Sequence, residues 1–169
     1  ASHSIYRDPW LEVDCDEVIR PDGLPGSHCV VRLKAGVCVL ALDSQGHVQL
    51  TEEFHYALGR TGLEAVSGGI EAGEEPLVTA RRELEEELGI VAAKWTDLGS
   101  IDPFTTVVLS PTRLFLAEGL ELGSARCEGT ELIRRVSLPL AEALRLVEEG
   151  TITHAPSCVL ILRVARLRL

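Results

Sequence analysis

The segment from residue 68 to residue 90 constrains the fold of this chain more than any other. It reads GGIEAGEEPLVTARRELEEELGI and carries seven glutamates against two arginines. A proline favours the first turn of a helix and a glycine the position just beyond its end, so Pro76 and Gly89 predict a helix from Pro76 to Leu88. One face of this helix is apolar and needs another layer of the protein to cover it. That face consists of Leu77, Ala80, Leu84 and Leu88.

Three glutamates of the predicted helix share one flank. Glu83, Glu86 and Glu87 occupy positions i, i+3 and i+4, where like charges destabilise a helix by about 0.2–0.5 kcal/mol per pair. A hard divalent cation such as Mg²⁺ or Mn²⁺ reverses that sign, because it binds carboxylate oxygens together with water and substrate phosphates. The spacing is therefore compatible with a metal site. Taken by itself, however, a run of glutamates on a helix is usually a face that meets only solvent.

The rest of the chain has the composition of a folded domain. Of its 169 residues, 46% are hydrophobic and 25% are charged, which excludes a disordered chain. Apolar runs before and after the helix predict strands, so we expect one α+β domain over residues 1–169. The expected strands are residues 10–19, 28–33, 36–42, 47–54, 63–66, 94–101, 113–119 and 131–138, and the further helices are residues 139–149 and 156–169.

The charge and the cysteines limit the partners and the setting of the protein. A net charge of −10 repels nucleic-acid backbones, so a nucleic-acid polymer is not expected as a partner. No run of about 18 apolar residues occurs, so we expect neither a membrane span nor a membrane partner. Five cysteines without a CxxC pair predict reduced thiols, and with no leader-like N-terminus this favours a cytoplasmic protein.

The 68–90 segment fits the pattern G-x5-E-x7-R-E-U-x-E-E-x-G-U, in which U is a bulky aliphatic residue. Its fixed positions are filled by Gly68, Glu74, Arg82, Glu83, Leu84, Glu86, Glu87, Gly89 and Ile90. This pattern is the Nudix box, and the sequence resembles the Nudix hydrolase family. The resemblance implies a divalent metal bound by the carbonyl of Ser67 and by Glu83, Glu86 and Glu87.

The resemblance also implies roles for the other positions of the box. Arg82 is expected to orient one of the glutamates, and Glu74 to tie the loop to the helix. Gly68 and Gly69 let the backbone approach the metal and a substrate phosphate closely. Leu84, Gly89 and Ile90 are expected to be structural.

Outside the box, most of the chain resembles the ADP-ribose pyrophosphatase branch of the family. This implies a Nudix-type α/β/α sandwich with a mixed central sheet, preceded by an N-terminal antiparallel strand segment, about residues 1–33, that forms a homodimer. Three positions depart from the branch, because it usually has a proline at Val66, an arginine at His55 and a proline at Thr105. Related nucleoside diphosphate sugars therefore stay open as substrates.

Further site residues follow from the same resemblance. The candidates for substrate binding, besides Gly68 and Gly69, are His55, Arg60, Glu64, Phe104 and Thr105. The catalytic base is expected in the loop 126–131, with Glu131 as the first candidate and Glu128 as the second. Tyr6, Trp10 and Phe104 are the candidates for stacking a nucleotide base, and packing is the alternative for each.

The resemblance implies an enzyme that hydrolyses the diphosphate of ADP-ribose or a related nucleoside diphosphate sugar with Mg²⁺ or Mn²⁺. The products are a nucleoside monophosphate and a sugar phosphate, formed by attack of a metal-activated water. Other readings are a Nudix hydrolase for an oxidised nucleotide or a dinucleoside polyphosphate, a non-catalytic sensor of nucleoside diphosphate sugars, and a structural protein with an acidic helix.

Overall fold

The computed structural model of the chain describes residues 1–125 and 132–168. Its central sheet contains β4 (Gly36–Leu42), β5 (His47–His55), β6 (Arg60–Glu64), β7 (Val66–Gly69), β8 (Ile90–Ile101), β10 (Thr112–Leu122) and β11 (Arg134–Pro139). The strand order is β11-β5-β4-β10-β8, with β6 paired to β5 and β7 paired to β4. The sheet is mixed, because β4 and β10 run parallel while the other pairs are antiparallel.

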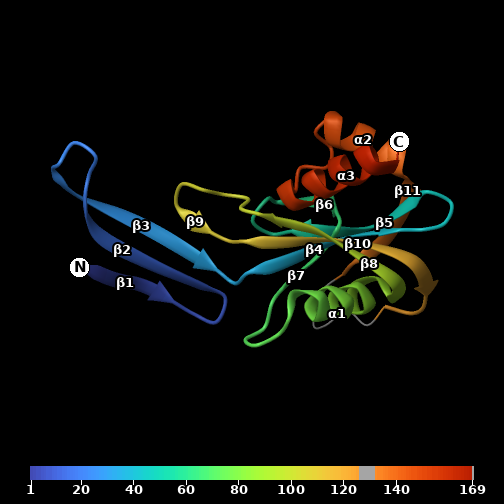
Figure 1. Cartoon of the computed structure of the whole chain (residues 1–169), viewed down its shortest axis with the longest axis horizontal. Coiled ribbons are helices and arrows are strands. Elements are labelled where there is room, and N and C mark those ends of the chain that lie inside the picture. Colours follow the sequence, from blue (N-terminus) through green and yellow to red (C-terminus); the bar gives the residue numbers. More distant parts are fainter. Residues whose placement is uncertain (126–131, 169) are drawn as a thin grey trace.

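Helices cover both faces of this sheet. In Figure 1, α1 (Pro76–Leu88) lies on one face, and α2 (Leu140–Glu148) and α3 (Ala155–Arg168) lie together on the other. Side chains alternate between the faces of a strand, so Val37 and Val39 of β4 join the core beneath α1, whereas Cys38 and Leu40 join the core beneath α2 and α3. The predicted α/β/α sandwich with a mixed sheet is confirmed. In the described part of the chain, no helix is long and apolar enough to cross a membrane.

Helix α1 has the bounds that the sequence predicts, because local signals fix both ends. Pro76 occupies the first turn. Gly89 follows with φ of 63°, and its N–H donates to the carbonyl of Glu85 over 2.9 Å. A side chain at Gly89 would also collide with the backbone, since its Cβ would lie 2.5 Å from the carbonyl carbon of Ser124.

A second sheet precedes the sandwich and projects from it as an arm (Figure 1). It consists of β1 (Ser2–Arg7), β2 (Leu11–Ile19), β3 (Pro25–Leu33) and β9 (Val108–Leu109), in that order. The predicted N-terminal antiparallel segment is therefore present. The sequence did not predict β1, whose side chains are all exposed and lack an apolar alternation, or the two-residue β9.

The prediction of five reduced thiols is wrong for one pair. Cys15 of β2 lies directly opposite Cys29 of β3, and the two form a disulfide with their Cα atoms 4.0 Å apart. Spacing along the sequence did not reveal this pair, because register across a hairpin brings the two residues together. Cys38 and Cys158 are free thiols, and Cys127 lies outside the described residues.

Candidate active site

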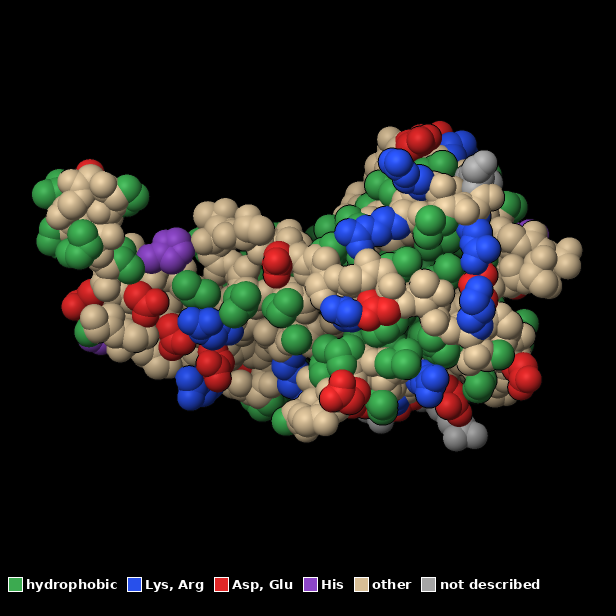
Figure 2. Space-filling view, in the orientation of Figure 1, with side chains coloured by type: hydrophobic (Ala, Val, Ile, Leu, Met, Phe, Trp, Pro, Cys, Tyr) green, Lys and Arg blue, Asp and Glu red, His purple; other side chains and the backbone are tan. Residues whose placement is uncertain are grey.

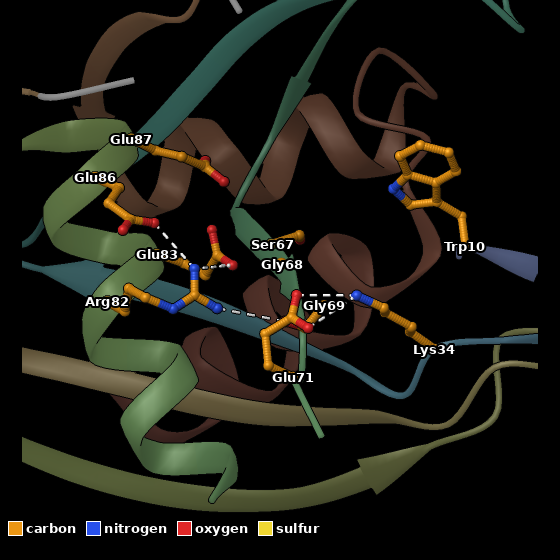
Figure 3. A pocket seen from close by; sticks show the side chains of 10 residues that line it. All are labelled: Trp10, Lys34, Ser67, Gly68, Gly69, Glu71, Arg82, Glu83, Glu86 and Glu87. Atoms are coloured by element: carbon orange, nitrogen blue, oxygen red, sulfur yellow. Dashed lines mark hydrogen bonds and ion pairs between the residues drawn. The ribbon is translucent and has the colours of Figure 1, made fainter. Parts of the chain in front are cut away.

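A pocket of about 340 Å³ lies between α1 and β7 (Figure 3). Helix α1 contributes its acidic flank, and β7 contributes two glycines. The turn between β1 and β2 and the junction between β3 and β4 contribute one side chain each. The lining residues are Trp10, Lys34, Ser67, Gly68, Gly69, Glu71, Arg82, Glu83, Glu86 and Glu87.

Strand β7 brings its backbone against the carboxylates because it has no side chain at Gly68. A Cβ at this position would lie 2.0 Å from the carboxyl carbon of Glu83, which no real contact allows. At Gly69 a Cβ would lie 3.5 Å from Cδ of Lys34, an ordinary contact. The side chain of Ser67 packs against Cys38, with Oγ 3.3 Å from Sγ, so a metal role for Ser67 falls to its main-chain carbonyl.

Arg82 gathers the acidic side chains of the pocket. Its Nη1 lies 2.8 Å from Oε1 of Glu83 and 3.0 Å from Oε2 of Glu86. Its Nε and Nη2 donate to the two carboxylate oxygens of Glu74, each over 3.3 Å, and Nη2 also donates to the carbonyl of Gly69 over 3.4 Å. One guanidinium thus connects the helix, the loop before it and β7.

The Arg82–Glu74 pair stays ionised at neutral pH. Hydrogen bonds from Arg82 lower the pKa of Glu74 to about 2, and the same contact raises the pKa of Arg82 above its ordinary value. Glu74 also accepts a hydrogen bond from the N–H of Glu71 over 3.3 Å. Glu74 therefore contacts both the loop before α1 and, through Arg82, the helix itself.

The residues of the pocket suit a hard divalent cation. Glu83, Glu86 and Glu87 supply carboxylate oxygens from one flank of α1, and Gly68 leaves room beside them. Within residues 1–125 and 132–168, no three acidic, histidine or cysteine side chains converge closely enough to hold a metal as they stand. Because Nη1 of Arg82 contacts two of the glutamates, a metal would compete with it for their oxygens.

Three predicted substrate residues lie elsewhere, next to α3. His55 Nε2 is 2.9 Å from Oε1 of Glu64, and Nη2 of Arg60 donates to Oγ1 of Thr153 over 2.7 Å. His154, which no sequence pattern singled out, lies with Nδ1 3.2 Å from the other oxygen of Glu64. Burial lowers the pKa of His154 below its ordinary value. None of these side chains lines the pocket.

Residues at the start of α3 hold the backbone that leads to the pocket. The hydroxyl of Ser157 accepts a hydrogen bond from the N–H of Ala65 over 2.8 Å and lies 2.8 Å from Nδ1 of His154. Ala65 lies between β6 and β7, two residues before Ser67. The start of α3 therefore holds the backbone that carries the expected metal-binding carbonyl. No local pattern in the sequence predicts a contact over this separation.

The remaining candidates are divided between the arm, a loop and undescribed residues. Trp10 lines the pocket, whereas the hydroxyl of Tyr6 donates to Asp8 over 3.0 Å outside it. Phe104 and Thr105 lie between β8 and β9, are exposed and do not line the pocket. Glu128 and Glu131 lie outside the described residues.

Comparison with known proteins agrees with this architecture. Residues 32–154 match the NUDIX domain, and residues 1–31 match the nucleoside diphosphate sugar hydrolase N-terminal domain. The chain is 30% identical over 163 residues to the ADP-ribose pyrophosphatase of Bacillus subtilis (strain 168). The aligned region covers 95% of this chain and 88% of that protein. The chain is also 32% identical over 167 residues to the ADP-ribose pyrophosphatase of Mycobacterium tuberculosis (strain ATCC 25618 / H37Rv), covering 97% and 81%.

A solved structure described as an ADP compounds hydrolase superposes with a TM-score of 0.85, at 21% identity, over 99% of this chain and 91% of that one. At this identity the likeness supports the fold. A hydrolase domain of the Nudix type is defined by three features together: the α/β/α sandwich, strand β7 with its two glycines, and helix α1 with its glutamates. The chain belongs to the Nudix hydrolase family, whose members generally use a divalent metal ion.

Proposed function

We propose that the protein hydrolyses the diphosphate bond of ADP-ribose or a related nucleoside diphosphate sugar, releasing a nucleoside monophosphate and a sugar phosphate. The observation that carries this proposal is the pocket in which Glu83, Glu86 and Glu87 face the glycines of β7. Two further findings support the substrate class. Residues 1–31 match a family named for nucleoside diphosphate sugar hydrolases, and two relatives are named ADP-ribose pyrophosphatases.

Mg²⁺, or Mn²⁺ in its place, would be held by the three glutamates and the carbonyl of Ser67. When bound, such a cation neutralises the diphosphate and lowers the pKa of a water that attacks phosphorus. The chain's own residues prepare the site: Arg82 orients Glu83 and Glu86, and Gly68 and Gly69 allow the substrate to approach the backbone. Glu131, or else Glu128, would take the proton of the attacking water.

Trp10 is the aromatic side chain that fits a nucleotide base. Its indole lines the pocket (Figure 3) and the residue is 70% exposed, so a planar ligand can reach it. Phe104 and Tyr6 remain the other candidates. The strand that leads to Ser67 is supported by His55, Arg60 and Glu64. These three residues would therefore affect substrate binding indirectly, through the position of that strand.

The protein is proposed to be a homodimer formed through its N-terminal arm. Figure 2 shows hydrophobic side chains on the surface of this arm. The exposed apolar residues of its strands and turns include Ile5, Ile19 and Leu24. Exposed apolar groups gathered in one region mark an interaction surface. Light scattering should report twice the chain mass, and Ile5→Asp with Ile19→Asp should give a monomer. A monomeric wild type would contradict the dimer.

A substrate panel tests the proposed activity. Purified protein with Mg²⁺ or Mn²⁺ is offered ADP-ribose, other nucleoside diphosphate sugars, an oxidised nucleoside triphosphate and a dinucleoside polyphosphate, and products are separated by chromatography. We expect the fastest turnover with a nucleoside diphosphate sugar and a large loss in Glu87→Gln. Faster turnover of another substrate would assign the enzyme to a different nucleotide. Tight binding without metal and without turnover would instead identify a sensor.

A further inference from the structure

The pocket holds two cationic side chains, and they differ in how they are engaged. Arg82 contacts Glu74, Glu83 and Glu86, so its donors serve the structure of the site. Among the described residues, Lys34 pairs with Glu71, with Nζ 2.9 Å and 3.1 Å from its two carboxylate oxygens. An ammonium has three donors, and Lys34 therefore keeps capacity for a further acceptor.

Lys34 lines the same pocket as the carboxylates that would bind the metal. Its aliphatic stem lies beside Gly69, and the carboxyl group of Glu83 lies against Gly68. Successive residues of a strand face opposite sides, so Lys34 and Glu83 approach β7 from different sides, and both line the pocket. Figure 3 shows Lys34 and Trp10 on the side of the glycines away from α1, with the side chain of Glu71 drawn across Gly69 and directed at Lys34. A diphosphate that starts at the glutamates and extends toward Trp10 passes Lys34.

The ion pair between Lys34 and Glu71 is weak enough for a substrate phosphate to replace Glu71. Side chains of Lys34 and Glu71 are 39% and 63% exposed, and exposed ion pairs are weak. A phosphate offers several charged oxygens to the same ammonium, and lysine is an established binder of phosphate as a point charge. Every other charged side chain lining the pocket, apart from Arg82, is acidic, so an uncovered phosphate would find no other spare cation among these residues.

We propose that Lys34 binds one phosphate group of the substrate, the one that the metal leaves uncovered. In the absence of substrate, Glu71 holds Lys34 beside the pocket, and the substrate phosphate then takes the place of Glu71. This inference rests on the proposed function and names a residue that binds its substrate. Neither residue belongs to the pattern that identified the site.

Lys34→Ala tests the proposal, with Lys94→Ala as the matched control. Lys94 forms a similar surface pair, 2.8 Å from Glu118, between β8 and β10 and outside the pocket. With Mg²⁺ and the best substrate of the panel, Lys34→Ala should raise KM about tenfold and change kcat little, since a charged hydrogen bond contributes to binding at this scale. Lys34→Arg should recover most of the loss, Glu71→Gln should leave KM equal or lower, and Lys94→Ala should match the wild type.

Calorimetric titration with ADP and Mg²⁺ separates failure of this inference from failure of the proposed function. Lys34→Ala should raise the Kd for ADP about tenfold relative to Lys94→Ala, whether or not any nucleoside diphosphate sugar is hydrolysed. Absence of turnover in the wild type would overturn the proposed function alone. Equal Kd values for the two alanine variants, or no binding of ADP by the wild type, would overturn the role of Lys34.

Discussion

Nη1 of Arg82 lies 2.8 Å from Oε1 of Glu83, although the two residues are adjacent on α1. Neighbouring side chains of a helix point about 100° apart, so the guanidinium must bend sideways to make this contact. Glu86 lies four residues further on, on the same face of the helix as Arg82, and Nη1 contacts it over 3.0 Å. Arg82 thus offsets part of the repulsion among the glutamates and sets where their oxygens lie.

Replacing Arg82 with alanine should lower kcat/KM by about 10- to 100-fold, because charged hydrogen bonds that position Glu83 and Glu86 are lost. Steady-state kinetics at saturating Mg²⁺ measure this. Arg81→Ala is the matched control, since Arg81 lies over the ring of Trp95, 5.9 Å from its centroid, and does not line the pocket. Equal kinetics for the two variants would show that Arg82 does not position the glutamates.

Gly68→Ala should abolish most of the activity while the protein stays folded. The added Cβ would lie 2.0 Å from the carboxyl carbon of Glu83 and would push that carboxylate out of place. Gly69→Ala should cost much less, because its Cβ would make an ordinary 3.5 Å contact with Lys34. Assays beside circular dichroism measure both effects, and a larger loss from Gly69→Ala would contradict this geometry.

Glu74 should make stability depend on pH in the acid range. Its pKa is lowered from 4.5 to about 2 in the folded protein, so the unfolded chain binds its proton first. The stabilisation is therefore fully present above the unfolded pKa of about 4.5 and is lost as pH falls toward 2. Urea unfolding should show Glu74→Gln as less stable than wild type at pH 7, with a gap that narrows toward pH 2.5. A stability difference between the two proteins that does not change with pH would contradict the lowered pKa of Glu74.

Ser157→Ala should lower the free energy of unfolding by about 1–3 kcal/mol, because it leaves the buried N–H of Ala65 without its acceptor. Ser44→Ala, in an exposed turn, should change stability by less than about 0.5 kcal/mol. Chemical denaturation measures both. If Ser157→Ala unfolds like Ser44→Ala, the hydrogen bond to Ala65 contributes little.

Local signals in the sequence predicted the helix and its acidic flank well. Pro76 and Gly89 set the ends of α1 through effects that act within one turn, and the spacing of Glu83, Glu86 and Glu87 follows from helical geometry alone. The resemblance to a known family then supplied the architecture around them.

Contacts between distant parts of the chain were not predictable in the same way. The pair of Glu64 with His154 and that of Lys34 with Glu71 join residues far apart in the sequence, and neither pair carries a spacing that reveals it. The disulfide of Cys15 with Cys29 depends on strand register, which no count of cysteines reports. Such pairs are fixed by the topology of the sheets.

Phosphorus NMR of ADP-ribose with Mg²⁺ and the purified protein tests the central claim most directly. The diphosphate resonances should disappear and two phosphate monoester resonances should replace them. Chelation of the metal should stop the conversion, and Glu87→Gln should slow it by at least about 100-fold, because a metal ligand is removed. Unchanged diphosphate resonances for ADP-ribose and for other nucleoside diphosphate sugars, or equal conversion by Glu87→Gln, would contradict the proposed activity.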